Sequence, residues 1–109
     1  MALNYKVIIT PSAGYSIKDI HDYIENCYDD PYVADNISRK IVSFIKNMSY
    51  NPFIGRVADD EQLQGKSIRR ITALGRYNIF YRVDEQSQTV YILKIADGRQ
   101  SDEQQLRGL

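Results

Sequence analysis

Basic and aromatic residues are concentrated in one segment, which reads GKSIRRITALGRYNIFYRVDEQSQTVYILKIADGR from Gly65 to Arg99. Within it, the seventeen positions from Lys66 to Arg82 hold five basic residues and no acidic residue. Arginine binds phosphate or carboxylate oxygens through paired N–H groups and stacks on aromatic rings. The pattern therefore indicates a surface that could bind a polyanion, stabilise a phosphate transition state or contact an acidic protein. The basic residues are Lys66, Arg69, Arg70, Arg76 and Arg82, and Arg99 closes the segment in an Asp-Gly-Arg corner.

Several of these arginines could form one site if the strands that carry them lie side by side. We expect the site to combine arginines from adjacent strands with a flanking tyrosine, namely Arg69, Arg70, Arg82 and Arg99 with Tyr77 or Tyr81. A simpler interpretation needs no ligand, because alternate strand residues must face water and the arginine stem packs while its head is solvated. Both interpretations stay open at this point.

The remaining reactive side chains are few and isolated. His21 is the only histidine, so a two-histidine metal site or acid–base pair is excluded, and its apolar neighbours place it at the edge of a helix face. Cys27 belongs to that apolar face, which favours structural burial over a nucleophilic role. The acidic run Asp59-Asp60-Glu61 is typical of a solvated loop. We therefore expect no metal site and no cofactor.

Length and composition restrict the class of protein. A chain of 109 residues predicts one domain over residues 1–109 with a single core. Fourteen basic and fourteen acidic residues balance, so the chain lacks the positive excess typical of proteins that bind nucleic acid non-specifically. One cysteine fits a reducing cytosol, the opening MALNYKVIIT is too short and polar for a signal peptide, and no apolar run approaches ~20 residues. We expect a soluble, cytoplasmic protein without a membrane segment.

A strand and two helices precede the basic segment. Residues 5–10 form an apolar, β-branched run that predicts a strand buried on both faces. Thr10 and Pro11 suit the start of a first helix, and Asp30 and Pro31 suit the start of a second. A connection of about three residues makes these helices an antiparallel hairpin. Each helix has one apolar face, formed by Ala13, Ile17, Ile20, Ile24, Cys27 and Tyr28 in the first and by Ala34, Ile37, Ile41, Phe44, Ile45 and Met48 in the second.

Three further strands, over residues 68–73, 77–83 and 89–96, carry the basic side chains. In the second of them, Tyr77, Ile79, Tyr81 and Val83 share one face, and Asn78, Phe80 and Arg82 share the other. Residues 101–104 form a capping box that opens a short final helix. These elements predict an α+β fold of order β-α-α-β-β-β. The helical hairpin packs on one face of a mainly antiparallel sheet, and the arginines cover the opposite face.

In this order and spacing, the motifs of the chain are similar to those of a known group of proteins. The strand KVIIT, the helix with IKDIHDYI, the turn NPFIGR, the RRI strand, YNIFYRVDE, and VYILKI running into DGR cover residues 5 to 103. Together they resemble the RelE/ParE superfamily of toxins from type II toxin–antitoxin modules, which also implies a role in plasmid stabilisation. The resemblance implies one of two activities. RelE-like members cut messenger RNA in the ribosome, and ParE-like members inhibit DNA gyrase.

Only some of the residues that RelE-like enzymes use have a counterpart here. The arginine at the end of the last long strand is present as Arg99, and Arg69 or Arg70 could fill one of two lysine positions on the earlier strand. The arginine that follows the strand tyrosine is replaced by Asn78, and the tail tyrosine is missing from residues 101–105. Each catalytic group of this kind contributes ~10²–10⁴ in rate, so two losses weaken the nuclease hypothesis.

The neutral charge, the long helices and the incomplete nuclease set favour a ParE-like inhibitor of DNA gyrase. One alternative is a RelE-like ribosome-dependent mRNA endoribonuclease, an mRNA interferase, with Arg70, Arg82 and Arg99 as its catalytic contacts to phosphate. A second alternative is an inactive family member that only binds the antitoxin. No feature of the sequence distinguishes these activities directly.

The resemblance also implies partners. We expect a cognate antitoxin to bury an amphipathic segment against the helical hairpin and the sheet edge, with acidic side chains that meet Arg69, Arg70 or Arg82. Sequence-specific DNA binding would come from the antitoxin, because no helix of this chain resembles a DNA-reading helix. The other partner is gyrase or, in the alternative, the ribosome with its mRNA. The expected contact residues are Lys66, Arg69, Arg70, Arg76, Tyr77, Tyr81, Arg82 and Arg99.

Overall fold

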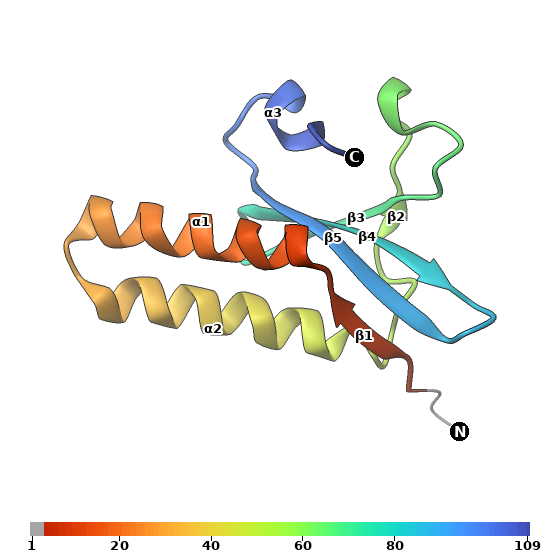
Figure 1. Ribbon diagram of the computed structural model, residues 1–109, viewed down its shortest axis with the longest axis horizontal. Coiled ribbons are helices and arrows are strands. Elements are labelled where there is room, and N and C mark those ends of the chain that lie inside the picture. The colour runs from red at the N-terminus through yellow and green to blue at the C-terminus, as the bar shows by residue number, and fades with distance from the viewer. Residues whose placement is uncertain (1–3) are drawn as a thin grey trace.

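A helical hairpin lies against one face of a five-stranded sheet in the computed structural model, which describes residues 4–109 (Figure 1). This arrangement confirms the predicted α+β fold. Among the described residues, no helix is long and apolar enough to cross a membrane. The elements are β1 (Lys6–Ile9), α1 (Pro11–Tyr28), α2 (Pro31–Asn47), β2 (Arg56–Val57), the 3-10 turn η1 (Glu61–Leu63), β3 (Arg69–Ala73), β4 (Tyr77–Asp84), β5 (Thr89–Asp97) and α3 (Asp102–Leu106).

The strands follow the order β1-β5-β4-β3-β2, so the last strand lies next to the first. β1 runs parallel to β5, and the other three pairs are antiparallel. The four predicted strands are confirmed to within one residue at each end, but the two-residue strand β2 was not predicted. The prediction that the first strand is buried on both faces is wrong, because β1 is an edge strand in which Lys6 is exposed and the next three residues are half-buried.

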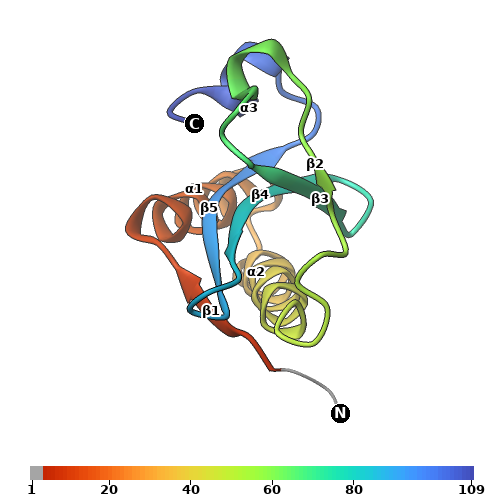
Figure 2. The same cartoon turned by 90° about the vertical axis from the view of Figure 1, so that its right-hand side faces the viewer.

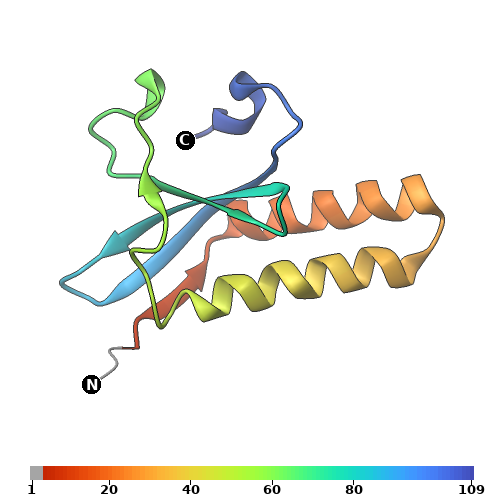
Figure 3. The same cartoon turned by 180° about the vertical axis from the view of Figure 1, so that it is seen from behind.

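Local sequence signals set the limits of the two long helices. The Thr10 hydroxyl accepts a hydrogen bond from the Ala13 N–H at 3.3 Å, and a proline follows it at the first helical position. The Asp30 carboxylate caps α2 in the same way, accepting from the Tyr32 N–H at 2.9 Å. Between the helices, Asp29 adopts a left-handed backbone with φ 49° and ends α1. The turn between the helices extends beyond the sheet (Figure 3).

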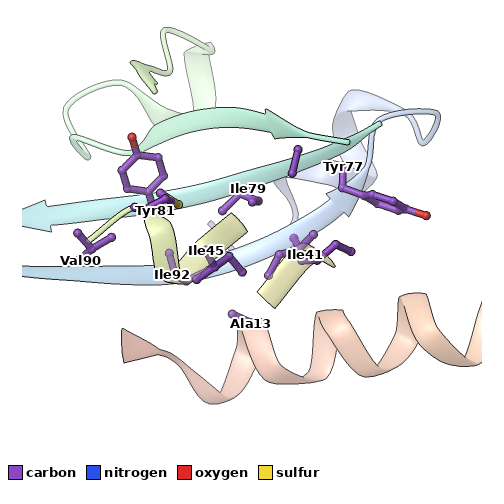
Figure 4. Close-up of a cluster of buried hydrophobic side chains, with 11 residues drawn as sticks. Ala13, Ile41, Ile45, Tyr77, Ile79, Tyr81, Val90 and Ile92 are labelled. Atoms are coloured by element: carbon purple, nitrogen blue, oxygen red, sulfur yellow. The ribbon is translucent and has the colours of Figure 1, made fainter. Parts of the chain in front are cut away.

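The apolar faces of both helices and the sheet enclose the main core (Figure 4). Each large apolar side chain buried there contributes roughly 1.5–3 kcal/mol to stability. The predicted face of β4 is confirmed, since its odd-numbered residues from 77 to 83 all point toward the helices. The buried members of this core are Ala13, Ile41, Ile45, Met48, Ala73, Tyr77, Ile79, Tyr81, Val90, Ile92 and Ile95.

The face of the sheet that points away from the hairpin, called here the outer face, carries a second apolar cluster. α3 and the η1 turn lie on this side (Figure 2). The prediction that this face carries the arginines is therefore incomplete, because apolar side chains from β4, β5, α3 and the segment between β2 and β3 share it. The buried members of the outer cluster are Ala58, Leu63, Ile68, Phe80, Ala96 and Leu106.

Candidate functional site

The arginines of the basic segment lie on different faces and at different ends of the sheet, so the expected single cluster does not form. Arg69 and Arg70 are consecutive in β3 and therefore point to opposite faces. Arg69 lies on the helical face with its cross-strand partner Tyr81. Arg70 and Arg82 lie on the outer face, and Arg99 lies beyond the end of β5.

Arg69 and Tyr81 both hold the turn that leads into β2. The Arg69 guanidinium donates to the Gly55 carbonyl at 2.7 Å and lies 4.9 Å from the centre of the Phe53 ring. The buried Tyr81 hydroxyl accepts a hydrogen bond from the Gly55 N–H at 2.8 Å. A Cβ at Gly55 would lie 2.7 Å from that hydroxyl oxygen, so only glycine fits. These contacts give both side chains a structural role.

A row of cross-strand neighbours places positive charge on the outer face. In order along the row these neighbours are Arg56 on β2, Arg70 on β3, Phe80 on β4 and Lys94 on β5. The Arg70 guanidinium lies 5.9 Å from the centre of the Phe80 ring, which is within the range of a cation–π interaction. Its Nη1 lies 3.7 Å from a carboxylate oxygen of Asp60, so part of its charge is balanced.

Two lysines of the basic region bind main-chain carbonyls near the C-terminus. The Lys94 ammonium donates to the carbonyls of Gln104 at 2.7 Å and Arg107 at 2.9 Å. Burial and the charge of Arg107 both lower the pKa of Lys94. The Lys66 ammonium donates to the Leu109 carbonyl at 2.6 Å. Both lysines thereby fix the segment around α3 on the outer face.

Arg82 is an exposed arginine of the outer face. Its side chain is exposed, and within residues 4–109 no hydrogen bond or salt bridge holds it. It faces Tyr91 across β4 and β5 and lines an open pocket of about 680 Å³ beside the hairpin of residues 83–86. This position suits contact with an anionic group of a partner.

The corner after β5 is built around Asp97. The Arg76 guanidinium donates to both oxygens of Asp97, at 2.7 and 3.3 Å, and the Arg99 N–H donates to it at 3.0 Å. The Arg76 hydrogen bonds, opposed by partial burial and assisted by Arg99, lower the pKa of Asp97 from 3.8 to about 2. Gly98 is required here, because a Cβ would lie 2.7 Å from the Arg76 carbonyl oxygen.

A groove of about 840 Å³ opens beside this corner, between α1 and the C-terminal segment. Tyr77 lines the groove although it is only 3% exposed, and its ring extends outward from the main core (Figure 4). Its hydroxyl has no hydrogen-bond partner among the described residues. Burial, partly offset by the charge of Arg76, raises the pKa of Tyr77, so the hydroxyl stays protonated near neutral pH.

Asn78, for which the resemblance to RelE-like enzymes implies an arginine, is hydrogen-bonded through both its side-chain oxygen and its side-chain nitrogen. Its side-chain carbonyl accepts a hydrogen bond from the Thr72 hydroxyl at 2.7 Å, and its amide N–H donates to the Gln105 side chain at 2.7 Å. These bonds tie β3 and β4 to α3. An amide in this place has no group that could exchange a proton with a substrate.

His21 and Cys27 both lie on α1, far along the chain from the basic segment. The His21 Nε2 lies 2.7 Å from a carboxylate oxygen of Asp35 on α2, and this hydrogen bond raises the pKa of His21. The Nδ1 atom is 3.6 and 3.7 Å from carboxylate oxygens of Asp22 and Glu25, an exposed group that the sequence did not reveal. The prediction that Cys27 is buried is wrong, since the end of the hairpin projects beyond the sheet.

Several residues of the outer face and of the groove could not be recognised as site residues from the sequence. Arg56 belongs to a strand too short for a periodic signal, and Lys94 is a single charge in an apolar run. Tyr23 and Arg107 line the groove beside Tyr77, and only the folded chain brings these distant positions together. The first helix contains Tyr15, Tyr23 and Tyr28, but their spacing in the sequence does not show which of them borders the groove.

Similar proteins identify the family of this chain. No curated protein sequence matches it significantly. Two solved structures share the fold: the toxin–antitoxin complex RelBE2 from Mycobacterium tuberculosis, at 23% identity and a TM-score of 0.62 over 86% of this chain and 98% of that chain, and the chromosomal ParDE toxin–antitoxin system from P. aeruginosa, at 19% identity and a TM-score of 0.72 over 88% and 98%. The family model described as "ParE toxin of type II toxin-antitoxin system, parDE" matches residues 7–102. Since this match spans nearly the whole sequence, the chain belongs to the ParE toxin family of type II toxin–antitoxin systems.

Proposed function

We propose that this toxin acts in the ParE manner, by inhibiting DNA gyrase, and that a cognate antitoxin neutralises it. The observation that supports this most directly is the ParE family match over residues 7–102. The charge balance favours the same activity, because the chain has a formal net charge of zero. An enzyme that must hold RNA on the ribosome benefits from a large positive excess.

The placement of the arginines argues against an RNA-cleaving centre. A phosphate transition state needs several donors around one phosphorus atom. Arg70 and Arg82 lie on the outer face, whereas Arg99 lies past the end of β5 and contacts Asp97. Asn78 replaces the remaining arginine and is hydrogen-bonded on both sides. The residues expected for nuclease chemistry are therefore separated or committed to structural contacts.

The outer face offers a contact surface for gyrase. It combines the positive row through Arg56 and Arg70 with the exposed Arg82 and its neighbour Tyr91. Arginine and tyrosine are enriched at the centres of protein interfaces, where they contribute much of the binding energy. Acidic side chains of the target would meet the exposed guanidinium groups of Arg56 and Arg82, since Arg70 already contacts Asp60.

The free edge of β2 and the loop between α2 and β2 suit contact with the antitoxin. Four large apolar side chains of β2 and of the loop before it are exposed. A sheet edge with unpaired main-chain groups and apolar neighbours suits an added extended or amphipathic segment. The four side chains are Tyr50 at 66%, Phe53 at 41%, Ile54 at 50% and Val57 at 55% exposure.

A supercoiling assay with purified gyrase and nuclease-free toxin tests the proposal. We expect the wild-type toxin to inhibit supercoiling and the double substitution Arg70→Glu, Arg82→Glu to weaken that inhibition. Arg39→Glu is the matched control, because Arg39 is exposed on α2 and lies away from the outer face. Absence of inhibition at a large excess of wild-type toxin would refute gyrase as the target.

The RelE-like activity remains the second candidate because Arg99 keeps free donors near Tyr77. The Arg99 side chain is 63% exposed, and its one ion pair with the residues that the structure describes is to the Asp97 carboxylate, at 3.4 Å. Rapid cleavage inside coding regions after induction of the toxin, abolished by Arg99→Ala, would establish this activity instead. Normal growth on strong induction without antitoxin would identify an inactive family member.

A further inference from the structure

Three side chains that commonly bind metal ions converge on one surface of α1. Residues three and four positions apart lie next to one another on a helix, and Glu25 has these spacings from Asp22 and His21. One ligand atom from each of the three lies within 4.8 Å of the other two. The His21 Nδ1 atom is 3.6 Å from an oxygen of Asp22 and 3.7 Å from an oxygen of Glu25. The converging atoms are thus one imidazole nitrogen and two carboxylate oxygens.

The hydrogen bond to Asp35 determines which nitrogen of His21 is available to a metal ion. An ionised carboxylate only accepts hydrogen bonds, so the 2.7 Å contact with Asp35 on α2 requires the proton on Nε2. In the neutral ring, Nδ1 then carries a lone pair that faces two further carboxylate oxygens. Such electron-rich atoms repel one another unless a positive charge lies between them. This arrangement favours a cation beside Nδ1.

We propose that His21, Asp22 and Glu25 bind a divalent transition-metal ion such as Zn²⁺. Tetrahedral zinc places neighbouring nitrogen and oxygen ligands about 3.3–3.5 Å apart, so the two distances from Nδ1 need to shorten only slightly. A carboxylate on the other ring nitrogen commonly orients a metal-binding histidine, which makes Asp35 a positioning residue. An imidazole ligand favours zinc over Mg²⁺ or Ca²⁺, which prefer oxygen ligands. A single histidine excludes a two-histidine site but not this mixed set.

The site is open to solvent and carries net negative charge. The side chains of His21, Asp22 and Glu25 are 26%, 50% and 47% exposed, so an ion can enter and keep water as its remaining ligand. The Lys18 ammonium contacts the other oxygen of Asp22 at 3.3 Å, but its side chain is 72% exposed and can move away. Three carboxylates around His21 outweigh this one ammonium. Because His21 also bonds Asp35, a bound ion should stabilise the contact between α1 and α2.

Isothermal titration calorimetry of the tag-free, full-length toxin with zinc chloride tests the proposal. We expect saturable binding of Zn²⁺ and a rise in melting temperature that EDTA reverses, because the ion binds the folded site. Asp35→Asn should weaken the affinity about tenfold, as for other carboxylates that orient a metal-binding histidine. His21→Ala removes a ligand and should weaken it further. Since His21 is the only histidine, the ¹⁵N resonance of its Nδ1 atom is unambiguous and should shift as zinc is added.

Asp59→Asn and Cys27→Ser are the matched controls, and both variants should bind Zn²⁺ as the wild type does. Asp59 is an exposed loop carboxylate, so its replacement removes one negative charge outside the site. Cys27 is an exposed thiol on the same helix, and thiolates also bind zinc. The absence of saturable binding up to about 1 mM Zn²⁺ would overturn the proposal. Equal binding by His21→Ala, a stationary Nδ1 resonance or loss of binding in Cys27→Ser would overturn it as well. None of these measurements involves gyrase, so their outcome is independent of the proposed function.

Discussion

Replacing Asp97 with asparagine tests whether charge holds the corner that follows β5. The side chain is 17% exposed and accepts hydrogen bonds from the Arg76 guanidinium and the Arg99 N–H. Its pKa falls from 3.8 to about 2 on folding. Since a tenfold change in proton affinity corresponds to about 1.4 kcal/mol, the carboxylate contributes about 2 kcal/mol to stability when it is ionised.

The dependence of stability on pH separates the contribution of the Asp97 charge from other effects of the substitution. A lowered pKa in the folded state means that the stabilisation is fully present above pH 3.8 and is lost as the pH falls through about 2. Asparagine does not ionise in this range, so the Asp97→Asn variant lacks this dependence. The difference in unfolding free energy between the two proteins should be about 2 kcal/mol at pH 7 and about half of that near pH 3.

Urea denaturation at pH 7, 5, 4 and 3 measures this difference directly. Asp59→Asn serves as the control, because Asp59 is an exposed loop residue that forms no ion pair with the other described residues. Each variant differs from the wild type at one carboxylate, so the comparison isolates the contribution of that group. A difference that stays constant from pH 7 to pH 3, or one that is absent at pH 7, would show that Arg76 and Asp97 are not coupled by charge.

Three further outcomes are expected from the fold. Gly55→Ala should destabilise the toxin by about 1–3 kcal/mol in thermal unfolding, since the new methyl group would displace Tyr81; an unchanged melting temperature would contradict the close approach of 2.7 Å. Ile41→Ala in the fully buried face of α2 should cost about 2–5 kcal/mol in urea, and a loss below 1 kcal/mol would argue against this core. The hydrogen bond to Asp35 raises the pKa of His21. The stabilisation from this interaction is therefore fully present below pH 6.5 and is lost as the pH rises through the higher pKa of the folded state. Asp35→Asn should therefore lower stability at pH 6 and have little effect at pH 9, and an equal effect at both would refute the link.

Much of the fold could be predicted because its signals are local. The capping residues and prolines at the start of each long helix, and the apolar repeat of α2, depend only on neighbours along the chain. The burial of residues at the end of the helical hairpin could not be predicted in this way. Cys27 continues the apolar repeat of α1, but its burial depends on whether the sheet extends that far, and the sheet does not.

The candidate site was harder to predict because it depends on which strand residues face the same way. Composition and spacing showed that arginines and tyrosines were concentrated, yet Arg69 and Arg70 point to opposite faces. Tyr81 matched the pattern of a contact residue but is buried under the turn at Gly55. The groove beside Tyr77 lies between α1 and the C-terminal segment. No local sequence pattern predicts that residues so far apart in the chain border the same groove.

The position of β5 between β1 and β4 has a consequence for synthesis on the ribosome. β1 is synthesised before the other strands, but within residues 4–109 it pairs with β5 alone, which places Lys6 opposite Thr89 and Ile9 opposite Ile92. The helical hairpin is complete long before β4 and β5 exist to cover its apolar face. Contacts between such distant segments form late and slowly. The nascent chain therefore exposes this face until β5 has been synthesised, and β1 cannot pair before that point.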